Sequence, residues 1–414
     1  MEKKLSTESY KGTRDFYPED MAIQRYIFDT WAKTAELFGF ERYDASILEP
    51  SELYKSKGAE NEEMINEQTY TFIDRGDREV TLRPEMTPTV ARMVAGKRRD
   101  LNFPVRWYSI PNLFRYERPQ RGRLREHWQL NCDMFGADHY SVDVEIIALA
   151  YNTLIAFGAT PDMFEIRVND RSWLNGIFGE FGLNPDQSKQ MLMLLDRKEK
   201  INNFDEEAEK ICGKPFILDL EEPENGSRLY DVCKGLQEIG IINNLKVSAS
   251  TVRGFNYYTS TVFEIFDTSP INNRSLMGGG RYDNLTGLFG GDPISGMGFG
   301  LGDVTMRDFL ETHNLLEGKV STTAPTLMIL PMDALQNIEA EKIAMAFRNA
   351  HIRTAIDLSD KKIGKKISHA DEVGVSYILV VGADETVSQI FTLKTLAIKS
   401  ETKGTVSELI TSLI

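Results

Sequence analysis

A polar stretch between Asn112 and Gly136 has the residue types and spacing to bind a charged substrate. We expect two strands here, Leu113 to Glu117 and Arg123 to Phe135, joined by a loop. Because side chains on a strand alternate between two faces, one face of the second strand is polar throughout. It carries Arg123, Arg125, His127, Gln129, Asn131 and Asp133. The other face is mostly apolar and carries Leu124, Glu126, Trp128, Leu130, Cys132 and Met134.

The order of charges on the polar face indicates what it could bind. Arginines come first, while Arg115 and Glu117 share a face of the preceding strand. An amide and a carboxylate follow at Gln129 and Asp133. This order fits an anion at one end and a cation or polar group at the other. An ordinary half-exposed strand also alternates, so the pattern leaves both interpretations open.

Two further segments carry candidate residues. Glu85 and Thr87 lie between a predicted strand and a predicted helix, where free backbone N–H groups can hold a carboxylate. Capping of that helix would explain both residues equally well. Arg253 stands in an apolar, aromatic stretch and is followed by Tyr257 and Tyr258. Burying an arginine without a partner is costly, so Arg253 requires an anion nearby.

The glycine-rich segment 277–302 matches neither common nucleotide-binding fingerprint. It has no Gly-Lys-Ser/Thr of a P-loop and no GxGxxG of a dinucleotide fold. Alternate glycines from Gly296 through Gly300 to Gly302 instead predict a strand with one bare face. A bare face lets a flat ligand or another backbone approach closely, and tight packing against a helix would require the same.

Composition bounds the class of protein. The 414 residues are enough for two or three domains, and 41% hydrophobic with 27% charged residues is ordinary for a globular protein. A net charge of −14 argues against bulk affinity for nucleic acid, although six arginines fall between positions 106 and 125. Three separated cysteines and five scattered histidines indicate a reducing compartment and no zinc site. We expect no signal peptide, no membrane span and a cytoplasmic location.

The pattern predicts elements that could position these residues. Expected in the first part are a helix over 18–38, a strand over 40–47, a hairpin over 69–74 and 79–83, and helices over 89–95 and 142–156. The interval 160–248 is rich in charge and helix signals, and 170–247 has the character of an insertion. Strands return over 248–266.

A separate α/β domain is expected after a linker at 321–325. Its predicted strands are 326–330, 353–357, 377–382 and 390–396, and its predicted helices are 335–349, 362–374 and 405–412. Strands that alternate with helices, and a continuous apolar strand at YILVV, indicate a largely parallel core. Lysines from Lys361 to Lys366 form a second basic cluster, which a solvated helix face would also explain.

Five segments together resemble the histidyl-tRNA synthetase family of class II aminoacyl-tRNA synthetases. They are GTRDFYPED (12–20), TLRPEMTPTVARM (81–93), FRYERPQRGRLREHWQLNCDMFG (114–136), TVRGFNYYTSTVFE (251–264) and GGGRYDNL (278–285). The resemblance implies an α+β fold whose antiparallel sheet is flanked by helices. It implies a catalytic domain at 1–324, a C-terminal α/β anticodon-binding domain at 325–414, and a homodimer built through 18–50.

The resemblance also implies a two-step reaction. The carboxylate of L-histidine attacks the α-phosphate of ATP, with Mg²⁺, and the adenylate then transfers histidine to tRNA(His). The implied catalytic residues are Arg115 and Arg253. The implied histidine-binding residues are Glu85, Thr87, Gln129, Asp133, Tyr257 and Tyr258. The implied ATP-binding residues are Arg115, Glu117, Arg123, His127, Gly300 and Gly302. The loop 118–122 would contact the acceptor end of the tRNA, and the Lys361–Lys366 region the anticodon stem.

Three departures from the family pattern stand out. The third class motif has a glutamate and an arginine where this chain has Asp303 and Val304, and Arg307 could compensate. His127 occupies the position of an adenine-stacking phenylalanine, and Asn256 that of an aspartate. A regulatory subunit of ATP phosphoribosyltransferase with the same catalytic fold is therefore the alternative. Such subunits typically lack the VRGxxYY segment and the anticodon-binding domain, both of which this sequence has.

Overall fold

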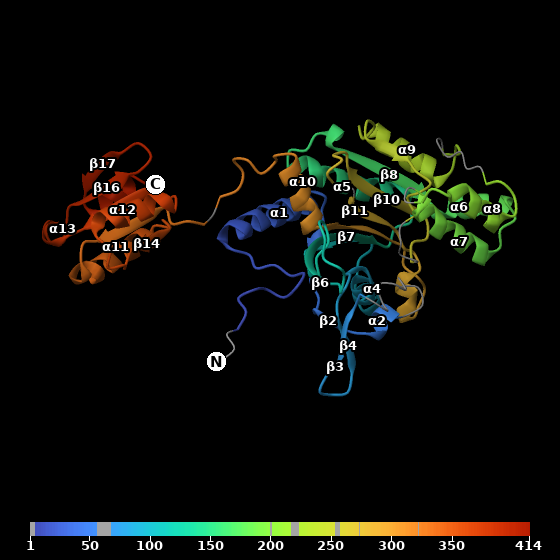
Figure 1. Cartoon of the computed structure of the whole chain (residues 1–414), viewed down its shortest axis with the longest axis horizontal. Coiled ribbons are helices and arrows are strands. Elements are labelled where there is room, and N and C mark those ends of the chain that lie inside the picture. The colour runs from blue at the N-terminus through green and yellow to red at the C-terminus, as the bar shows by residue number, and fades with distance from the viewer. Residues whose placement is uncertain are drawn as a thin grey trace. The chain divides into compact units, whose positions relative to one another are not determined.

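A computed structural model describes residues 5–55, 68–198, 201–216, 223–252, 257–272, 274–321 and 323–414. The chain divides into two compact units, Met1–Ser321 and Thr322–Ile414. Each unit has its own sheet (Figure 1). In the part of the chain that is described, no helix is long and apolar enough to cross a lipid bilayer.

A nine-stranded, mostly antiparallel sheet forms the centre of the larger unit. Its order is β1-β5-β7-β12-β11-β10-β8-β9, with β6 paired to β7. The strands are β1 (Glu41–Arg42), β5 (Val105–Ser109), β6 (Asn112–Phe114), β7 (Glu126–Phe135), β8 (Phe164–Asp170), β9 (Leu245–Val247), β10 (Thr261–Asp267), β11 (Ser275–Arg281) and β12 (Gly296–Gly302). The expected antiparallel sheet of an α+β fold is confirmed.

Helices cover one face of this sheet and leave the polar residues on the other. The covering helices are α1 (Pro18–Leu37), α5 (Tyr140–Ala156), α9 (Arg228–Glu238) and α10 (Asp303–Thr312) (Figure 1). Leu130, Cys132 and Met134 of β7 are buried in the same apolar core as Met297 and Leu301 of β12. The alternation predicted for β7 is therefore confirmed over its regular part, and burial of the apolar face fixes which side is polar.

The beginning of β7 differs from the prediction. The strand starts at Glu126 and not at Arg123, because residues 115–125 form an irregular loop with one bridge, Gln120 to Arg123. Arg125 leaves the polar face: its guanidinium lies 4.0 Å from the ring centroid of Tyr116 and donates a hydrogen bond to the backbone oxygen of Glu117. A cation–π contact thus removes this arginine from the polar row.

A smaller sheet borders the polar face. Its order is β2 (Leu48–Pro50), β4 (Glu79–Leu82) and β3 (Tyr70–Ile73), and the predicted hairpin is confirmed as β3 and β4. Helix α2 (Glu52–Lys55) follows β2, and α4 (Thr87–Gly96) follows β4. The single strand expected over 40–47 is wrong. The chain changes sheets between β1 and β2, where Arg83 donates a 2.8 Å hydrogen bond to the backbone oxygen of Ala45.

The interval 170–247 is divided between two cores. Helices α6 (Arg171–Glu180), α7 (Pro185–Asp196) and α8 (Phe204–Cys212) form an apolar cluster of their own. Helix α9 instead packs on α5, and its Leu229, Val232 and Leu236 belong to the main core. The sheet also includes β8 and β9, which the charge-rich sequence of this region did not suggest.

The C-terminal unit has the expected alternation of strands and helices. Its sheet order is β14 (Thr354–Ile356), β13 (Leu327–Pro331), β15 (Tyr377–Val381), β16 (Phe391–Thr395) and β17 (Ser400–Gly404), with the first three strands parallel. The helices are α11 (Asn337–Asn349), α12 (Ile363–Glu372), α13 (Ala383–Ser388) and α14 (Val406–Thr411). Strand β17 and helix α13 were not predicted. Lys366 is buried, with its Nζ 3.0 Å from two backbone oxygens, so it cannot form part of an exposed basic surface.

Candidate functional site

A cavity of about 1070 Å³ opens on the polar side of the central sheet. It is lined by seven of the residues predicted to act in the site, together with parts of α10 and β11. These seven are Arg115, Glu117, Arg123, His127, Gln129, Gly300 and Gly302. Strands β7 and β12 are antiparallel neighbours with Asn131 opposite Gly300, so their polar and bare faces coincide. The structure therefore brings the predicted nucleotide-side residues into one cavity.

Positive charge dominates this cavity. Among the described lining residues are five arginines and three carboxylates. Arg115 donates a 2.9 Å hydrogen bond from Nε to the backbone oxygen of Pro84, which holds its guanidinium without neutralising it. Arg123 Nε lies 3.4 Å from a carboxylate oxygen of Glu117. An excess of guanidinium groups in a partly enclosed space is suited to binding a polyanion.

His127 is partly buried in the wall of the cavity and is neutral. Desolvation by burial, together with the positive charges of Arg115 and Arg14, lowers the pKa of its imidazole to about 3. An uncharged ring adds no repulsion to a bound cation and can stack on a flat aromatic ligand. The sequence placed an imidazole here without indicating its protonation state, which burial decides.

A second, smaller pocket adjoins the first. Both are lined by Arg115, Gln129, Gly278 and Gly300, so the two pockets are neighbours that share these four residues. The smaller pocket is also lined by Glu85, Thr87, Tyr257 and Tyr258, as predicted. Tyr257 donates a 3.0 Å hydrogen bond from its hydroxyl to Glu85 Oε2. Burial raises the pKa of the Tyr257 phenol, as does the nearby Glu85, so the hydroxyl remains a hydrogen-bond donor.

Asp133 lies behind the smaller pocket and is not among its lining residues. It is 2% exposed, and its Oδ1 accepts a short hydrogen bond from the hydroxyl of Tyr282. Its Oδ2 is buried with no hydrogen-bond partner among the described residues. Burial raises the pKa of this carboxyl from 3.8 to about 7, and the Tyr282 hydroxyl opposes that rise. A cationic or hydrogen-bond-donating ligand nearby would stabilise its charged form.

The glycines of β12 allow the side chains of β7 to lie over them. A Cβ atom added to Gly300 would lie 2.7 Å from the Gln129 side chain, and one added to Gly298 would lie 2.7 Å from the Tyr282 hydroxyl. Larger residues at these positions would displace Gln129 and Tyr282. The bare face thus lines the pocket and lets Gln129 and Tyr282 pack closely, whereas the helix packing that the sequence left open is not what these glycines contact.

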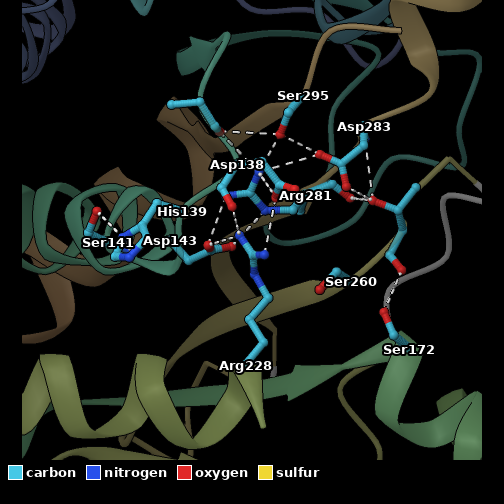
Figure 2. Close-up of polar contacts among 12 residues, drawn as sticks. Asp138, His139, Ser141, Asp143, Ser172, Arg228, Ser260, Arg281, Asp283 and Ser295 are labelled. Atoms are coloured by element: carbon cyan, nitrogen blue, oxygen red, sulfur yellow. Dashed lines mark hydrogen bonds and ion pairs between the residues drawn. The ribbon is translucent and has the colours of Figure 1, made fainter. Parts of the chain in front are cut away.

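A buried ion network anchors the tyrosines of this pocket (Figure 2). Arg281 and Arg228 both point toward Asp143, and each has a nitrogen 2.8 Å from its Oδ2. Asp283, two residues after Arg281, accepts a 2.7 Å hydrogen bond from the Thr259 hydroxyl. Thr259 directly follows the tyrosine pair, and Tyr282 directly follows Arg281. The network therefore joins β11, α5 and α9 to the segment that presents the phenols.

Comparison with known proteins gives the family. A family model described as histidyl-tRNA synthetase matches residues 12–210 and 216–303, and one described as an anticodon binding domain matches 326–414. A histidine–tRNA ligase of Leptospira biflexa is 42% identical, covering 98% of this chain and 97% of the relative. The corresponding ligase of Pyrococcus horikoshii is 32% identical, covering 94% of each chain. The chain belongs to the histidyl-tRNA synthetase family.

Solved structures show the fold of the family. Histidyl-tRNA synthetase from Nostoc sp. has a TM-score of 0.78 at 22% identity, covering 99% of this chain and 100% of that one. An ATP phosphoribosyltransferase regulatory subunit/histidyl-tRNA synthetase from Bacillus halodurans has a TM-score of 0.70 at 21% identity, covering 92% and 100%. At these identities the likeness establishes the architecture, which the synthetases share with that regulatory subunit.

The structure shows whether Arg307 compensates for the arginine of the family pattern that is absent at Val304. Arg307 does not replace the arginine absent at Val304: its Nη1 lies 2.9 Å from Asp20 and its Nε 2.7 Å from Glu311, and it does not line the cavity. Asp303 is buried, accepts a hydrogen bond from the Trp128 backbone N–H at 2.9 Å and pairs with Arg14 at 2.7 Å. Arg253 and Asn256 lie outside the described residues.

Sequence reasoning missed two residues of this synthetase site. Tyr282 lines the smaller pocket and binds Asp133, and Arg274 lines the larger cavity. Tyr282 directly follows β11 and shares the parity of Gly278 and Gly280, so strand alternation continued by one residue could have identified it. Arg274 comes just before the strand, where alternation gives no signal.

Proposed function

We propose that this protein ligates L-histidine to tRNA(His) in an ATP-dependent reaction that passes through a histidyl-adenylate. The observation that carries this proposal is that two neighbouring pockets share Arg115 and Gln129 in their lining. One pocket is rich in arginines, and the other contains carboxylate and phenol groups. A carboxylate substrate in the smaller pocket would therefore face a nucleotide phosphate in the larger one, which is the arrangement that in-line attack requires.

Histidine would occupy the smaller pocket. Glu85, Gln129 and Asp133 would hold the α-amino group, with Asp133 acting from behind Tyr282. Thr87 would frame the pocket, and Tyr257 and Tyr258 would contact the imidazole. The hydrogen bond from Tyr257 to Glu85 already fixes two of these groups. A pocket built from buried polar groups rejects isosteres that leave those groups unpaired, by about 10⁴-fold or more.

ATP would occupy the larger cavity. Arg115 would contact the α-phosphate, Arg123 the terminal phosphate and Glu117 the adenine amine, while His127 would stack on the base. Gly300 and Gly302 would let the nucleotide lie close to β12. The positive charge of Arg115, fixed before reaction by its bond to Pro84, would stabilise charge that develops on the phosphate. Arg253 would act from the opposite side.

Mg²⁺ would enter with the nucleotide. The described residues hold no cluster of three or more potential metal ligands, but Mg²⁺ needs one or two carboxylates in addition to substrate phosphates. Glu264 lines the cavity and would supply such a carboxylate, since Glu117 is assigned to the adenine amine. The ion would neutralise phosphate charge when bound.

The remaining assignments concern the whole assembly. We assign residues 1–324 to catalysis, with a helical insertion at 170–247, and residues 325–414 to the anticodon of tRNA(His). The loop 118–122 would meet the acceptor end of the tRNA, and a homodimer would form through 18–50. We expect the protein to act in the cytoplasm.

Pyrophosphate exchange tests the ligase against the regulatory alternative. The purified, folded protein should exchange labelled pyrophosphate into ATP when L-histidine is present and not when it is omitted or replaced by another amino acid. Absence of exchange would remove the ligase assignment and leave the regulatory subunit. Deletion of residues 325–414 should reduce tRNA charging far more than exchange, and equal losses would show that this unit supports the catalytic core.

A further inference from the structure

Arg274, just before β11, differs from the other arginines of the larger cavity. Each of the other four has a partner. Arg115 bonds to Pro84 at 2.9 Å, Arg121 lies 3.7 Å from Asp308, Arg123 lies 3.4 Å from Glu117, and Arg167 lies 2.6 Å from Glu165. Arg274 is half-buried, and within the described chain its guanidinium makes no hydrogen bond and no ion pair. A partly buried cation without a partner indicates a missing anion.

The surroundings of Arg274 do not neutralise it. Burial lowers the pKa of its guanidinium, and the charge of Arg123 lowers it further. Glu117 acts in the opposite direction, but this carboxylate already pairs with Arg123. Two guanidinium groups therefore share one carboxylate, and an anion bound between them would remove a repulsion as well as gain two attractions.

Arg274 and Val304 lie beside the same end of two paired strands. In the antiparallel pair of β11 and β12, Met277 lies opposite Leu301 and Gly278 opposite Gly300. Arg274 directly precedes β11, and Val304 comes two residues after the end of β12, in the first turn of α10. The next residue of α10, Thr305, donates a 3.0 Å hydrogen bond from its hydroxyl to the backbone oxygen of Leu276. Arg274 and Val304 line the same cavity.

We propose that Arg274 is an ATP-binding residue of this enzyme and contacts the polyphosphate together with Arg123. The positive charge that position 304 does not provide is thus supplied by the residue that directly precedes β11. Gly122 belongs to this arrangement, since a Cβ atom added there would lie 3.2 Å from Arg274 Cδ. Movement of the loop 118–122 on nucleotide or tRNA binding would therefore also move the side chain of Arg274. The inference rests on the proposed function and adds a residue to it.

Steady-state pyrophosphate exchange with the full-length protein tests this proposal. Arg274→Ala should raise the KM for ATP and the KM for pyrophosphate, which is itself a substrate of the exchange, about ten- to a hundredfold, the size of a lost charged hydrogen bond. The KM for histidine and the inhibition constant of AMP should change by less than about threefold. Arg274→Lys keeps the charge and should recover most of the loss. Arg307→Ala, which removes an arginine outside the cavity, should leave all four constants unchanged.

Two outcomes would overturn the proposal while the ligase function stands. One is an Arg274→Ala enzyme with wild-type constants for both ATP and pyrophosphate. The other is a loss confined to AMP, which would place Arg274 on the adenine. Should Arg274→Ala unfold, ATP and pyrophosphate binding to Arg274→Lys and Arg274→Gln by calorimetry gives the same decision. Failure of the wild-type enzyme to exchange pyrophosphate would instead remove the proposed function.

Discussion

Two clusters of charged residues lie on opposite sides of β11, and they are built differently. In the network around Asp143, the guanidinium groups of Arg281 and Arg228 contact one carboxylate, and Arg281 also reaches Asp138 and Asp283 (Figure 2). In the cavity, arginines outnumber carboxylates and Arg274 faces open space. Charges that pair with one another hold their backbone segments in place, whereas cations left in excess are available to bind an anionic ligand. The predictions below test this contrast in order of decreasing effect.

Substitution of Arg281 should damage the fold more than any substitution in the cavity. Arg281→Met leaves the Asp143 carboxylate buried with one partner fewer, and we expect the free energy of unfolding to fall by about 3–5 kcal/mol. Urea unfolding measures this. Arg307→Met, which breaks half-exposed pairs with Asp20 and Glu311, is the matched control and should cost less than about 1 kcal/mol. Equal losses in the two variants would contradict the contrast.

Substitution of Arg115 should slow the reaction and leave the stability of the fold nearly unchanged. Arg115→Ala should slow single-turnover formation of histidyl-adenylate by about 10²- to 10³-fold, because a fixed cation at the phosphate is lost. Its free energy of unfolding should change by less than about 1 kcal/mol, because its one backbone hydrogen bond is to Pro84. A normal adenylation rate would show that Arg115 does not act on the phosphate and has only a structural role.

Substitution of Glu85 should impair the binding of histidine in the smaller pocket and leave the binding of ATP in the larger one unchanged. Glu85→Gln replaces a carboxylate that accepts from Tyr257, and we expect the KM for histidine to rise about 10- to 100-fold. The KM for ATP should stay within threefold of the wild-type value. Glu117→Gln is the reciprocal control and should raise the KM for ATP alone. A shift of both constants in either variant would mean that the pockets act as one.

The most gradual effect concerns Asp133, because it accumulates over a range of pH. Its pKa is about 7 in the folded chain and 3.8 for the free side chain, so the folded protein holds a proton that the unfolded chain has released. Stability of the histidine-free protein should therefore fall as pH rises from about 4 to 7, by at most about 1.4 kcal/mol per pH unit. Asp133→Asn should flatten this slope in urea unfolding across that range. Identical pH profiles for the two proteins would show that Asp133 is charged throughout.

Much of the site could be predicted because it follows from strand alternation and distinctive local segments. Gln129, Glu85, Thr87 and the tyrosine pair lie where the sequence placed them, since burial of Leu130, Cys132 and Met134 leaves only one face for their neighbours. Arg125 was misplaced because its contact with Tyr116 arises from an irregular loop. Alternation applies to regular strands and fails where pairing stops.

By itself, the sequence determined the family, the two units, and the polar and bare faces of β7 and β12. Those properties are local, because they depend on residue order along single strands and helices. The tertiary structure decided which charges are satisfied. It paired Arg307 with Asp20, brought Arg274 and Val304 into the lining of one cavity, and raised the pKa of Asp133 by burying it behind Tyr282. These outcomes depend on contacts between segments distant in sequence, and electrostatic energies are set by such distances and by burial.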